Sequence, residues 1–198
     1  LRLVEGSCDL LIAYHHSSLP FQLDPQRYEM VSLGEEVMAP YVKPDASGQP
    51  LFSLPGRAGN LLPYLGYAPG AYLGQMVDVI LKQAATPIHF DRVYETDMAE
   101  GLKAMALEGH GVAFLPYSAV KKELRAKRLV SALPSGMAPL EVTMDVRAYR
   151  ERPTIQENVR AGGNARKSAS NGKNKTNGAT FGAQALWDYL AASSRQPE

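Results

Sequence analysis

The stretch of sequence that decides the fold reads TDMAEGLKAMALEGHGVAFLP and runs from Thr96 to Pro116. Its first part predicts a helix with Thr96 as N-cap, acidic side chains in the first turn, and apolar side chains at helical spacing. That apolar face comprises Met98, Leu102, Met105 and Ala106. Gly109 stands where a left-handed glycine ends a helix. The apolar run 112–115, which Pro116 ends, then predicts a buried strand.

This helix followed by Gly-His-Gly-Val-Ala-Phe-Leu-Pro resembles the effector-binding domain of LysR-type transcriptional regulators, whose usual form there is G-x-G-[IV]-[AS]-x-[LV]-P. A second family motif, E-G-x-x-D-L-x-I, is matched by residues 5–12. The resemblance implies an α/β, two-lobed fold of the type 2 periplasmic-binding-protein-like class. It also implies that about one N-terminal βαβ unit of the family is missing upstream of residue 1.

Composition places limits on the partners and the compartment. The chain has 198 residues, a formal net charge of +1 and a single cysteine, Cys8. The charge argues against nucleic-acid binding through a basic field, and one cysteine excludes an internal disulfide. No apolar run reaches the roughly 20 residues that cross a bilayer, and no signal segment opens the chain. We expect a soluble, cytoplasmic protein with no membrane contact.

Apolar patterns along the chain predict further elements on both sides of the deciding stretch. The predicted strands are 9–14, two strands around a Gly-Glu-Glu turn within 28–42, 61–65, 88–94, 129–133 and 142–149. The predicted helices have an apolar face at Leu73, Met76, Val77, Ile80, Leu81 and Ala84, a basic stretch at 119–128, and a closing segment at 181–192 with Leu186, Trp187 and Leu190 on one side.

The predicted lobes are 1–42 for the first part of lobe I, 43–143 for lobe II, and 144–198 for the return to lobe I. The chain is expected to cross between the lobes near 37–43 and near 144–150. Residues 153–182 are rich in Gly, Asn, Ser, Lys and Arg, which predicts a flexible basic insertion because few large apolar side chains offset the ordering entropy. A nucleic-acid arm is the alternative reading of this segment.

The resemblance implies that a small-molecule effector binds between the lobes, with an anion among the candidate ligands. It also implies a homodimer or homotetramer, and DNA binding only through an upstream winged helix-turn-helix that these residues do not contain. No cofactor is implied. Matched position by position, the effector site comprises Tyr14, His15, Tyr67, Ala68, Pro69, Gly70, Tyr72, Glu95, Thr96, Asp97, Phe114 and Pro116.

Helix N-termini near Gly70 and Asp97 would supply backbone amides to an anionic ligand. Taken without the resemblance, the same amides are simply met by water or by local side chains.

No catalytic or metal-binding constellation stands out, so the sequence predicts no enzyme and no metal site. Cys8 has no histidine near it in sequence, and its default is burial as a small hydrophobe. His15 and His16 are neighbours that point to opposite sides of an extended chain, and no third ligand follows at zinc-like spacing. For His110, between two glycines, an exposed turn position is favoured over a general base.

Seven methionines raise a second hypothesis, since oxidation turns a thioether polar. Within the LysR-type family the sequence most resembles the hypochlorite-responsive subgroup, and Met98 matches one of the sensing methionines of that subgroup. Leu73 stands where that subgroup carries another. For each methionine taken singly, core packing is the favoured role. An oxidant sensor and a solute-binding protein of the same fold are the two alternatives to an effector-sensing regulator.

Overall fold

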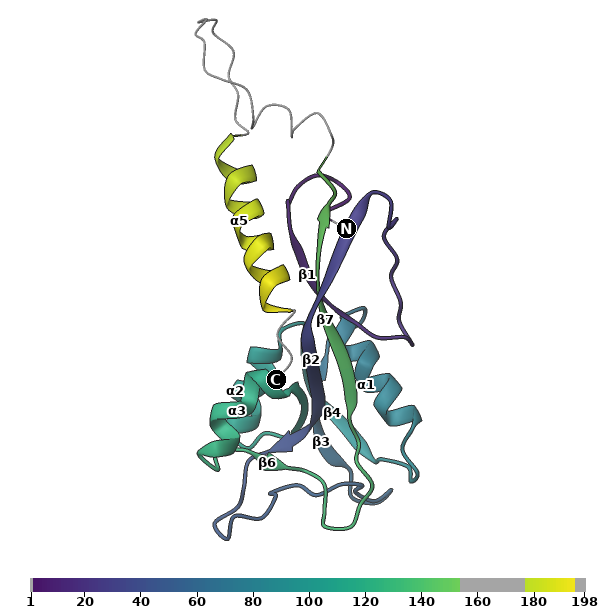
Figure 1. Cartoon of the computed structure of the whole chain (residues 1–198). Helices are drawn as coiled ribbons and strands as arrows, with labels where there is room; N and C mark the ends of the chain where they lie inside the picture. Colours follow the sequence, from purple (N-terminus) through teal and green to yellow (C-terminus); the bar gives the residue numbers. More distant parts are fainter. Residues whose placement is uncertain (1, 154–176, 195–198) are drawn as a thin grey trace, which may run out of the picture. The chain divides into compact units, whose positions relative to one another are not determined.

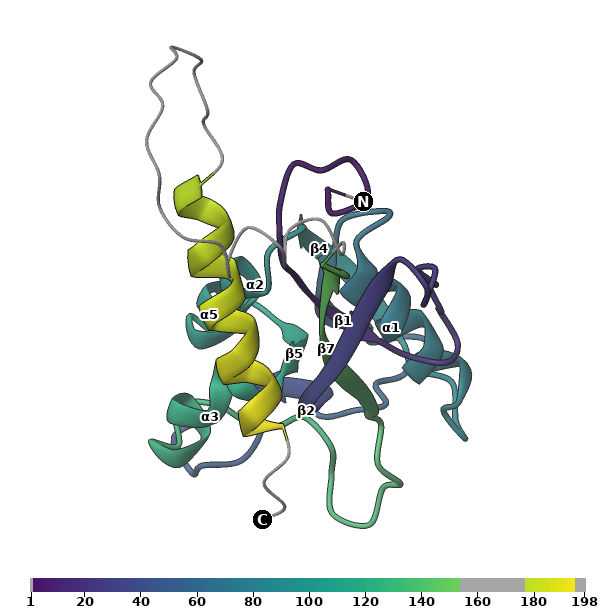
Figure 2. The same ribbon diagram turned by 45° about the horizontal axis from the view of Figure 1, so that its top comes forward.

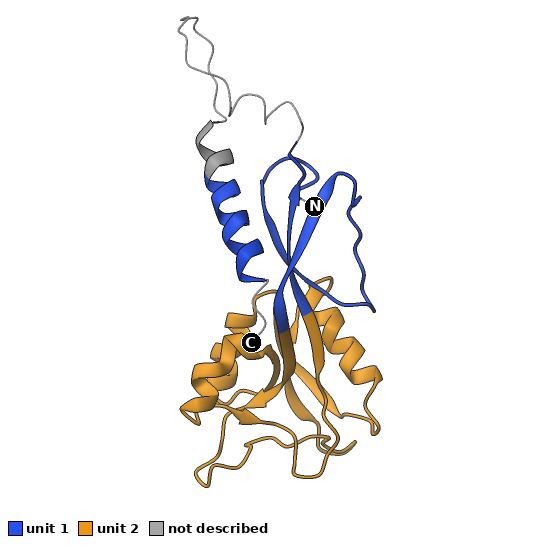
Figure 3. Ribbon diagram, in the orientation of Figure 1, with its two compact units in different colours: residues 1–35, 145–198 blue, residues 36–144 orange. Residues whose placement is uncertain are grey.

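The computed structural model (Figure 1) describes residues 2–153 and 177–194, so most of the predicted basic insertion lies outside the described residues. The chain divides into two compact units (Figure 3), which we describe separately. Unit 1 comprises residues 1–35 and 145–198, and unit 2 comprises residues 36–144. The chain passes from one unit to the other within strand β2 (Tyr28–Val42) and again within strand β7 (Val142–Glu151).

Unit 2 is a sheet covered by helices on both faces. Its strands are β3 (Leu62–Tyr67), β4 (Phe90–Thr96), β5 (Val112–Pro116), the short β6 (Val130–Ser131) and the second half of β2, in the order β2-β5-β3-β4. Strands β3, β4 and β5 are parallel, while β2 runs antiparallel to β5 and β6 pairs with β2. Helix α1 (Tyr72–Lys82) covers one face, and α2 (Ala99–Leu107) and α3 (Tyr117–Arg125) cover the other (Figures 1 and 2).

The core of unit 2 forms where the predicted apolar faces meet the central strands. Met76, Val77 and Ile80 of α1 are buried, which confirms the predicted apolar face at these three positions. Phe114 of β5 is fully buried, with ring centroids 6.4 Å from Tyr64 and 6.3 Å from Phe90. A buried Phe contributes a large apolar area, so this ring cluster anchors the sheet.

The deciding stretch folds as a helix, a turn and a strand, but the predicted start of the helix is wrong. Helix α2 begins at Ala99 with Met98 as N-cap. Thr96 still belongs to β4, because it pairs with Tyr67 in the parallel ladder. The Thr96 hydroxyl accepts a hydrogen bond from the Met98 amide (3.3 Å), so it closes a turn just before the helix.

The predicted end of α2 is confirmed. Gly109 has φ +86°, its amide donates to the Ala106 carbonyl (2.9 Å), and the His110 amide donates to the Met105 carbonyl (3.1 Å). These two bonds form a Schellman motif. Position 111 requires glycine for a different reason, which is close packing. A Cβ there would lie 2.6 Å from the carbonyl oxygen of Pro63 in β3.

Unit 1 contains β1 (Leu11–His15), the first half of β2, β7 and helix α5 (Asn177–Ser193). Strand β1 pairs antiparallel with β7, from Leu11 opposite Tyr149 to His15 opposite Asp145. The predicted pair of strands around a Gly-Glu-Glu turn is wrong, because β2 is one continuous strand. Gly34 adopts φ +127°, which lets the strand pass through this position without a reversal.

The core of unit 1 is small and is supplemented by polar contacts. Leu3, Tyr28 and Tyr149 form its buried cluster. The Arg150 guanidinium pairs with Glu29, donates to Gln184 Oε1 of α5 (2.7 Å), and lies 4.6 Å from the ring centroid of Trp187. Trp187 is 5% exposed, whereas Leu186 is largely exposed, so only part of the predicted apolar side of this helix is buried.

Candidate functional site

The carboxyl ends of the three parallel strands of unit 2 bring most of the predicted effector-site residues together. Tyr67 ends β3, Thr96 ends β4, and Pro116 ends β5. The Ala68 amide donates to the Thr96 carbonyl (2.9 Å), and the Tyr67 hydroxyl donates to the Phe114 carbonyl (3.0 Å). Ligands of open α/β sheets gather at this edge, which makes it a candidate binding surface.

The predicted residues at this edge fall into a buried set and an accessible set. Tyr67, Phe114 and Pro116 are buried, and their side chains hold the strand ends in place. The accessible set contains the exposed or partly exposed positions Ala68, Pro69, Gly70, Tyr72, Glu95, Thr96 and Asp97. Any ligand at this edge therefore meets the loop before α1 and the turn before α2.

Arg92 of β4 is a member of this edge that the sequence analysis missed. Its guanidinium lies 5.4 Å from the Tyr64 ring centroid and donates to the Tyr67 carbonyl (3.1 Å) and to Glu95 Oε2 (2.9 Å). Burial raises the pKa of Tyr64 to about 12, although the nearby Arg92 charge opposes that rise. The guanidinium thus pairs with Glu95. At the start of α2, Glu100 pairs with Lys103 (2.6 Å), and Asp97 is exposed.

Two helix N-termini open onto the same edge. Neither Ala71, the N-cap of α1, nor Met98, the N-cap of α2, provides a side-chain cap. The Ala71 amide donates to the Ala68 carbonyl (3.1 Å), and the Met98 amide donates to Thr96 Oγ1. The amides of the first turns beyond these caps point along the helix axis and can receive an anion or water.

The N-terminus of the third helix is closed by a side chain that sequence reasoning did not identify. Glu36 of β2 is 7% exposed, and its carboxylate accepts a hydrogen bond from the Ser118 amide in the first turn of α3 (3.0 Å). A carboxylate at this end of a helix is favoured by the helix dipole. Because Glu36 and Ser118 are far apart in sequence, only the pairing of β2 with β5 brings them together.

The other two predicted site residues, Tyr14 and His15, lie in β1 of unit 1. His15 stands opposite Asp145 in the ladder. Desolvation and the Arg147 charge lower the pKa of His15, although Asp145 opposes the shift. Desolvation works against ionisation of Asp145, but hydrogen bonds from Ser32 (2.6 Å) and Arg147 (2.6 Å) hold its pKa below the usual value.

The methionines range from fully buried to exposed, with Met105 and Met137 of intermediate exposure. Met38, Met76 and Met144 are fully buried, as expected for core filling. Met98 is 63% exposed at the N-cap of α2, and Met30 is 47% exposed on β2. The predicted role in core packing is therefore wrong for these two methionines. Met98 thus lies at the surface of unit 2, next to the accessible set.

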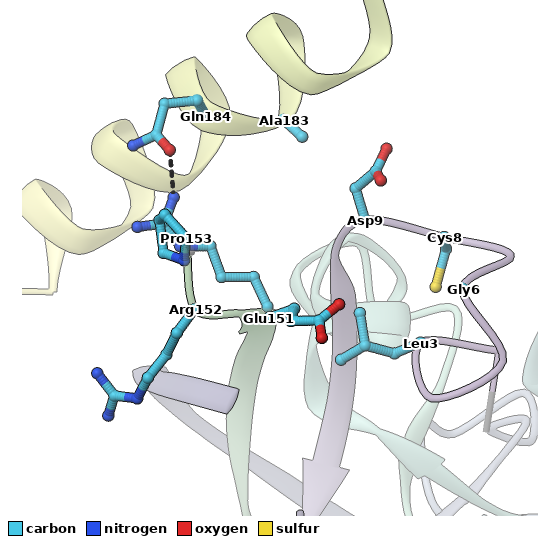
Figure 4. Close-up of a pocket in the computed structure, with 10 residues that line it drawn as sticks. Leu3, Gly6, Cys8, Asp9, Glu151, Arg152, Pro153, Ala183 and Gln184 are labelled. Atoms are coloured by element: carbon cyan, nitrogen blue, oxygen red, sulfur yellow. Dashed lines mark hydrogen bonds between the residues drawn. The ribbon is translucent and has the colours of Figure 1, made fainter. Parts of the chain in front are cut away.

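Cys8 lines a cavity of about 400 Å³ in unit 1, together with Asp9, Glu151 and Gln184 (Figure 4). The thiol is partly buried rather than fully enclosed. Among residues 2–153 and 177–194, no group of three or more His, Cys, Asp or Glu side chains could hold a metal ion. In the same part of the chain, no helix is long and apolar enough to cross a membrane.

The chain is similar in sequence to two curated transcriptional regulators. The chain is 28% identical over 160 residues to the HTH-type transcriptional regulator YjiE of Escherichia coli K12, covering 79% of this chain and 48% of that protein. It is also 28% identical over 160 residues to the HTH domain-truncated transcriptional regulator QseD of Escherichia coli O157:H7, covering 79% and 60% respectively. The chain thus spans about half to three fifths of these curated relatives.

Among solved structures, the chain is similar to full-length HypT of Salmonella typhimurium, a hypochlorite-specific LysR-type transcriptional regulator. The TM-score is 0.68 at 25% identity, over 96% of this chain and 53% of HypT. The family profile described as the LysR substrate binding domain matches residues 1–161. The chain therefore belongs to the LysR substrate-binding domain family of transcriptional regulators, and its α/β architecture is that of this periplasmic-binding-protein-like fold.

Proposed function

We propose that the chain is the effector-sensing part of a LysR-type regulator and that a small molecule binds at the carboxyl edge of β3, β4 and β5. The observation that supports this is the meeting of two helix starts without side-chain caps, at Ala71 and Met98, beside the accessible Thr96. First-turn amides and a hydroxyl within one edge are the few convergent polar groups that small-molecule sites use.

The charges at this edge favour a small ligand with a carboxylate. Helix N-termini stabilise negative charge, and Arg92 already offsets Glu95. Asp97 remains exposed and would favour a donor group, such as an amine, elsewhere on the same ligand. We therefore place small carboxylic acids, including amino acids, first among the candidate effectors.

In the whole protein we propose that an upstream winged helix-turn-helix binds DNA and that the domain pairs with itself. Effector binding would shift the balance between two states of the regulator only by its difference in affinity for them. By this proposal the chain performs no chemistry of its own.

The test is a thermal melt of the 198-residue chain against small carboxylates, aromatic acids and amino acids. A ligand at about 100 times its dissociation constant adds roughly 2.7 kcal/mol, which for this size raises Tm by roughly 5–10 °C. Thr96→Val should reduce the shift while leaving the ligand-free Tm near normal. Thr143→Val, an exposed threonine on β7, is the matched control. An equal shift in all three proteins would place the ligand elsewhere.

A second candidate function is oxidant sensing through Met98, supported by its exposure and by the similarity to HypT. Oxidation would put a polar sulfoxide at the start of α2. Limiting hypochlorite should oxidise Met98 to the sulfoxide before it oxidises the buried methionines. In the intact regulator, Met98→Gln should give the same transcriptional activity as the oxidised protein. Met30→Gln is the control, since Met30 is exposed in unit 1. Unchanged output from Met98→Gln would eliminate this candidate.

A further inference from the structure

Unit 1 contains a cavity that the proposed effector site does not use. It has a volume of about 460 Å³, within the range of roughly 300–1,000 Å³ typical of small-molecule sites. Segment 16–27, which connects β1 to β2, forms one wall, and strands β2 and β7 form the other. The lining residues that matter most are His15, Phe21, Tyr28, Arg147, Tyr149 and Arg152.

Aromatic rings make up much of this lining. The Phe21 and Tyr149 rings are tilted by 53° with centroids 5.2 Å apart, and the His15 ring meets the Phe21 ring edge-on at 6.4 Å. Tyr28 is 5% exposed, and its hydroxyl has no hydrogen-bond partner among the described residues. Tilted and edge-on rings offer both faces and edges to a further aromatic ring, which favours a flat guest.

The charged groups on the lining are two guanidinium groups and one carboxylate. Arg147 donates its Nε to Asp145 (2.6 Å), and Arg152 donates its Nε to the Pro25 carbonyl (2.9 Å). Each guanidinium has one further contact, since Arg147 also donates to the Tyr149 hydroxyl and Arg152 Nη1 faces Glu29. These contacts fix both side chains and still leave N–H groups of each fork for a ligand. The carboxylate, Glu29, pairs most closely with Arg150, which lies outside the lining, and its Oε2 lies 4.0 Å from Arg152 Nη1. The remaining guanidinium nitrogens favour an anion.

We propose that this cavity of unit 1 binds a small aromatic carboxylate, with its ring against Phe21 and Tyr149 and its carboxylate on Arg147 and Arg152. Planar guanidinium groups recognise carboxylates well, and aromatic walls select the ring over an aliphatic body of the same size. This site is separate from the proposed effector edge of unit 2, and it stands or falls independently of that proposal.

Binding is measured on the ¹⁵N-labelled full chain with phenylacetate as the probe. Phenylacetamide, which lacks the charge, and cyclohexylacetate, which lacks the aromatic ring, are the matched ligands. We expect saturable amide shifts confined to segments 16–30 and 145–152, with at least tenfold weaker binding for each matched ligand. If millimolar phenylacetate produces no saturable amide shifts in these segments, the proposal is overturned.

Two variants locate the site. Met30→Trp places a large ring on a lining position, and Arg152→Gln removes one guanidinium that is half exposed. Each should weaken phenylacetate binding at least tenfold. The controls are Val93→Trp, at an exposed position of β4, and Arg125→Gln on α3. Both should bind phenylacetate as the unmodified chain does.

Thr96→Val separates this site from the edge of unit 2. It should leave phenylacetate binding intact even where it abolishes an effector-induced shift in Tm. If Thr96→Val weakens phenylacetate binding and Met30→Trp does not, the probe occupies the unit 2 edge and the unit 1 site is refuted.

Discussion

Unit 2 and unit 1 are stabilised in different ways. Unit 2 is built from one continuous stretch of chain, and its central strands and helices bury aliphatic and aromatic side chains around Phe114. Unit 1 joins two distant stretches around the small cluster of Leu3, Tyr28 and Tyr149, with Arg150 connecting strands to α5. The contrast shows that one chain can rely on apolar burial in one unit and on polar connections in the other.

The largest expected effect comes from the core of unit 2. Phe114→Ala should lower the free energy of unfolding by about 3–5 kcal/mol, because it leaves a cavity beside the stacked rings of Tyr64 and Phe90. Urea unfolding followed by far-ultraviolet circular dichroism measures the loss. Leu61→Ala, at a largely exposed position of the same unit, should change stability by less than about 0.5 kcal/mol. Equal effects of the two variants would contradict the assignment of the core.

An intermediate effect is expected from the polar connection in unit 1. Arg150→Ala should cost about 2 kcal/mol, since it leaves Glu29 with only the more distant Arg152 and removes the cation from the Trp187 ring. Trp187 is the single tryptophan of the chain, so its fluorescence reports on this unit during urea unfolding. Arg125→Ala on α3 is the control. If Arg150→Ala leaves both the Trp187 emission and the unfolding midpoint unchanged, α5 is held by other contacts.

The smallest expected effect is the pH dependence of unit 1. The pKa of His15 is lowered below 6.5 in the folded chain, mainly by desolvation, so the unfolded chain takes up the proton at higher pH. The stability from neutral His15 is therefore complete above pH 6.5 and is lost as pH falls through the lower folded-state pKa.

Trp187 fluorescence in urea at about pH 7.5 and about pH 5.5 measures this difference. His15→Gln should reduce it, whereas His110→Gln, at an exposed turn, should not. An unchanged pH dependence in His15→Gln would assign the effect to other groups.

Local patterns predicted unit 2 well because its elements are regular and their ends carry their own signals. The Schellman motif at Gly109 and the buried face of α1 follow from residue spacing alone. The start of α2 was misplaced because Thr96 has two uses, as a helix cap or as the last residue of a paired strand, and only the ladder with Tyr67 decides between them.

The predictions that failed or were missing depend on contacts between distant residues. Arg92 reaches the Tyr67 carbonyl, and Glu36 reaches the Ser118 amide, only through strand order and register. The continuity of β2 through Gly34 likewise goes with its place between β7 and β5 in the sheet, which no short window of sequence contains.

The insertion of unit 2 between the two halves of unit 1 has a consequence for the order of events on the ribosome. Every residue of unit 2 has been synthesised by residue 144, but β1 must wait for β7 before Leu11 can pair opposite Tyr149. We therefore expect unit 2 to fold first, while β1 emerges with an unpaired edge that is open to aggregation or to chaperones. Nascent chains stalled before and after β7 should differ in protease resistance at β1, and equal resistance would contradict this order.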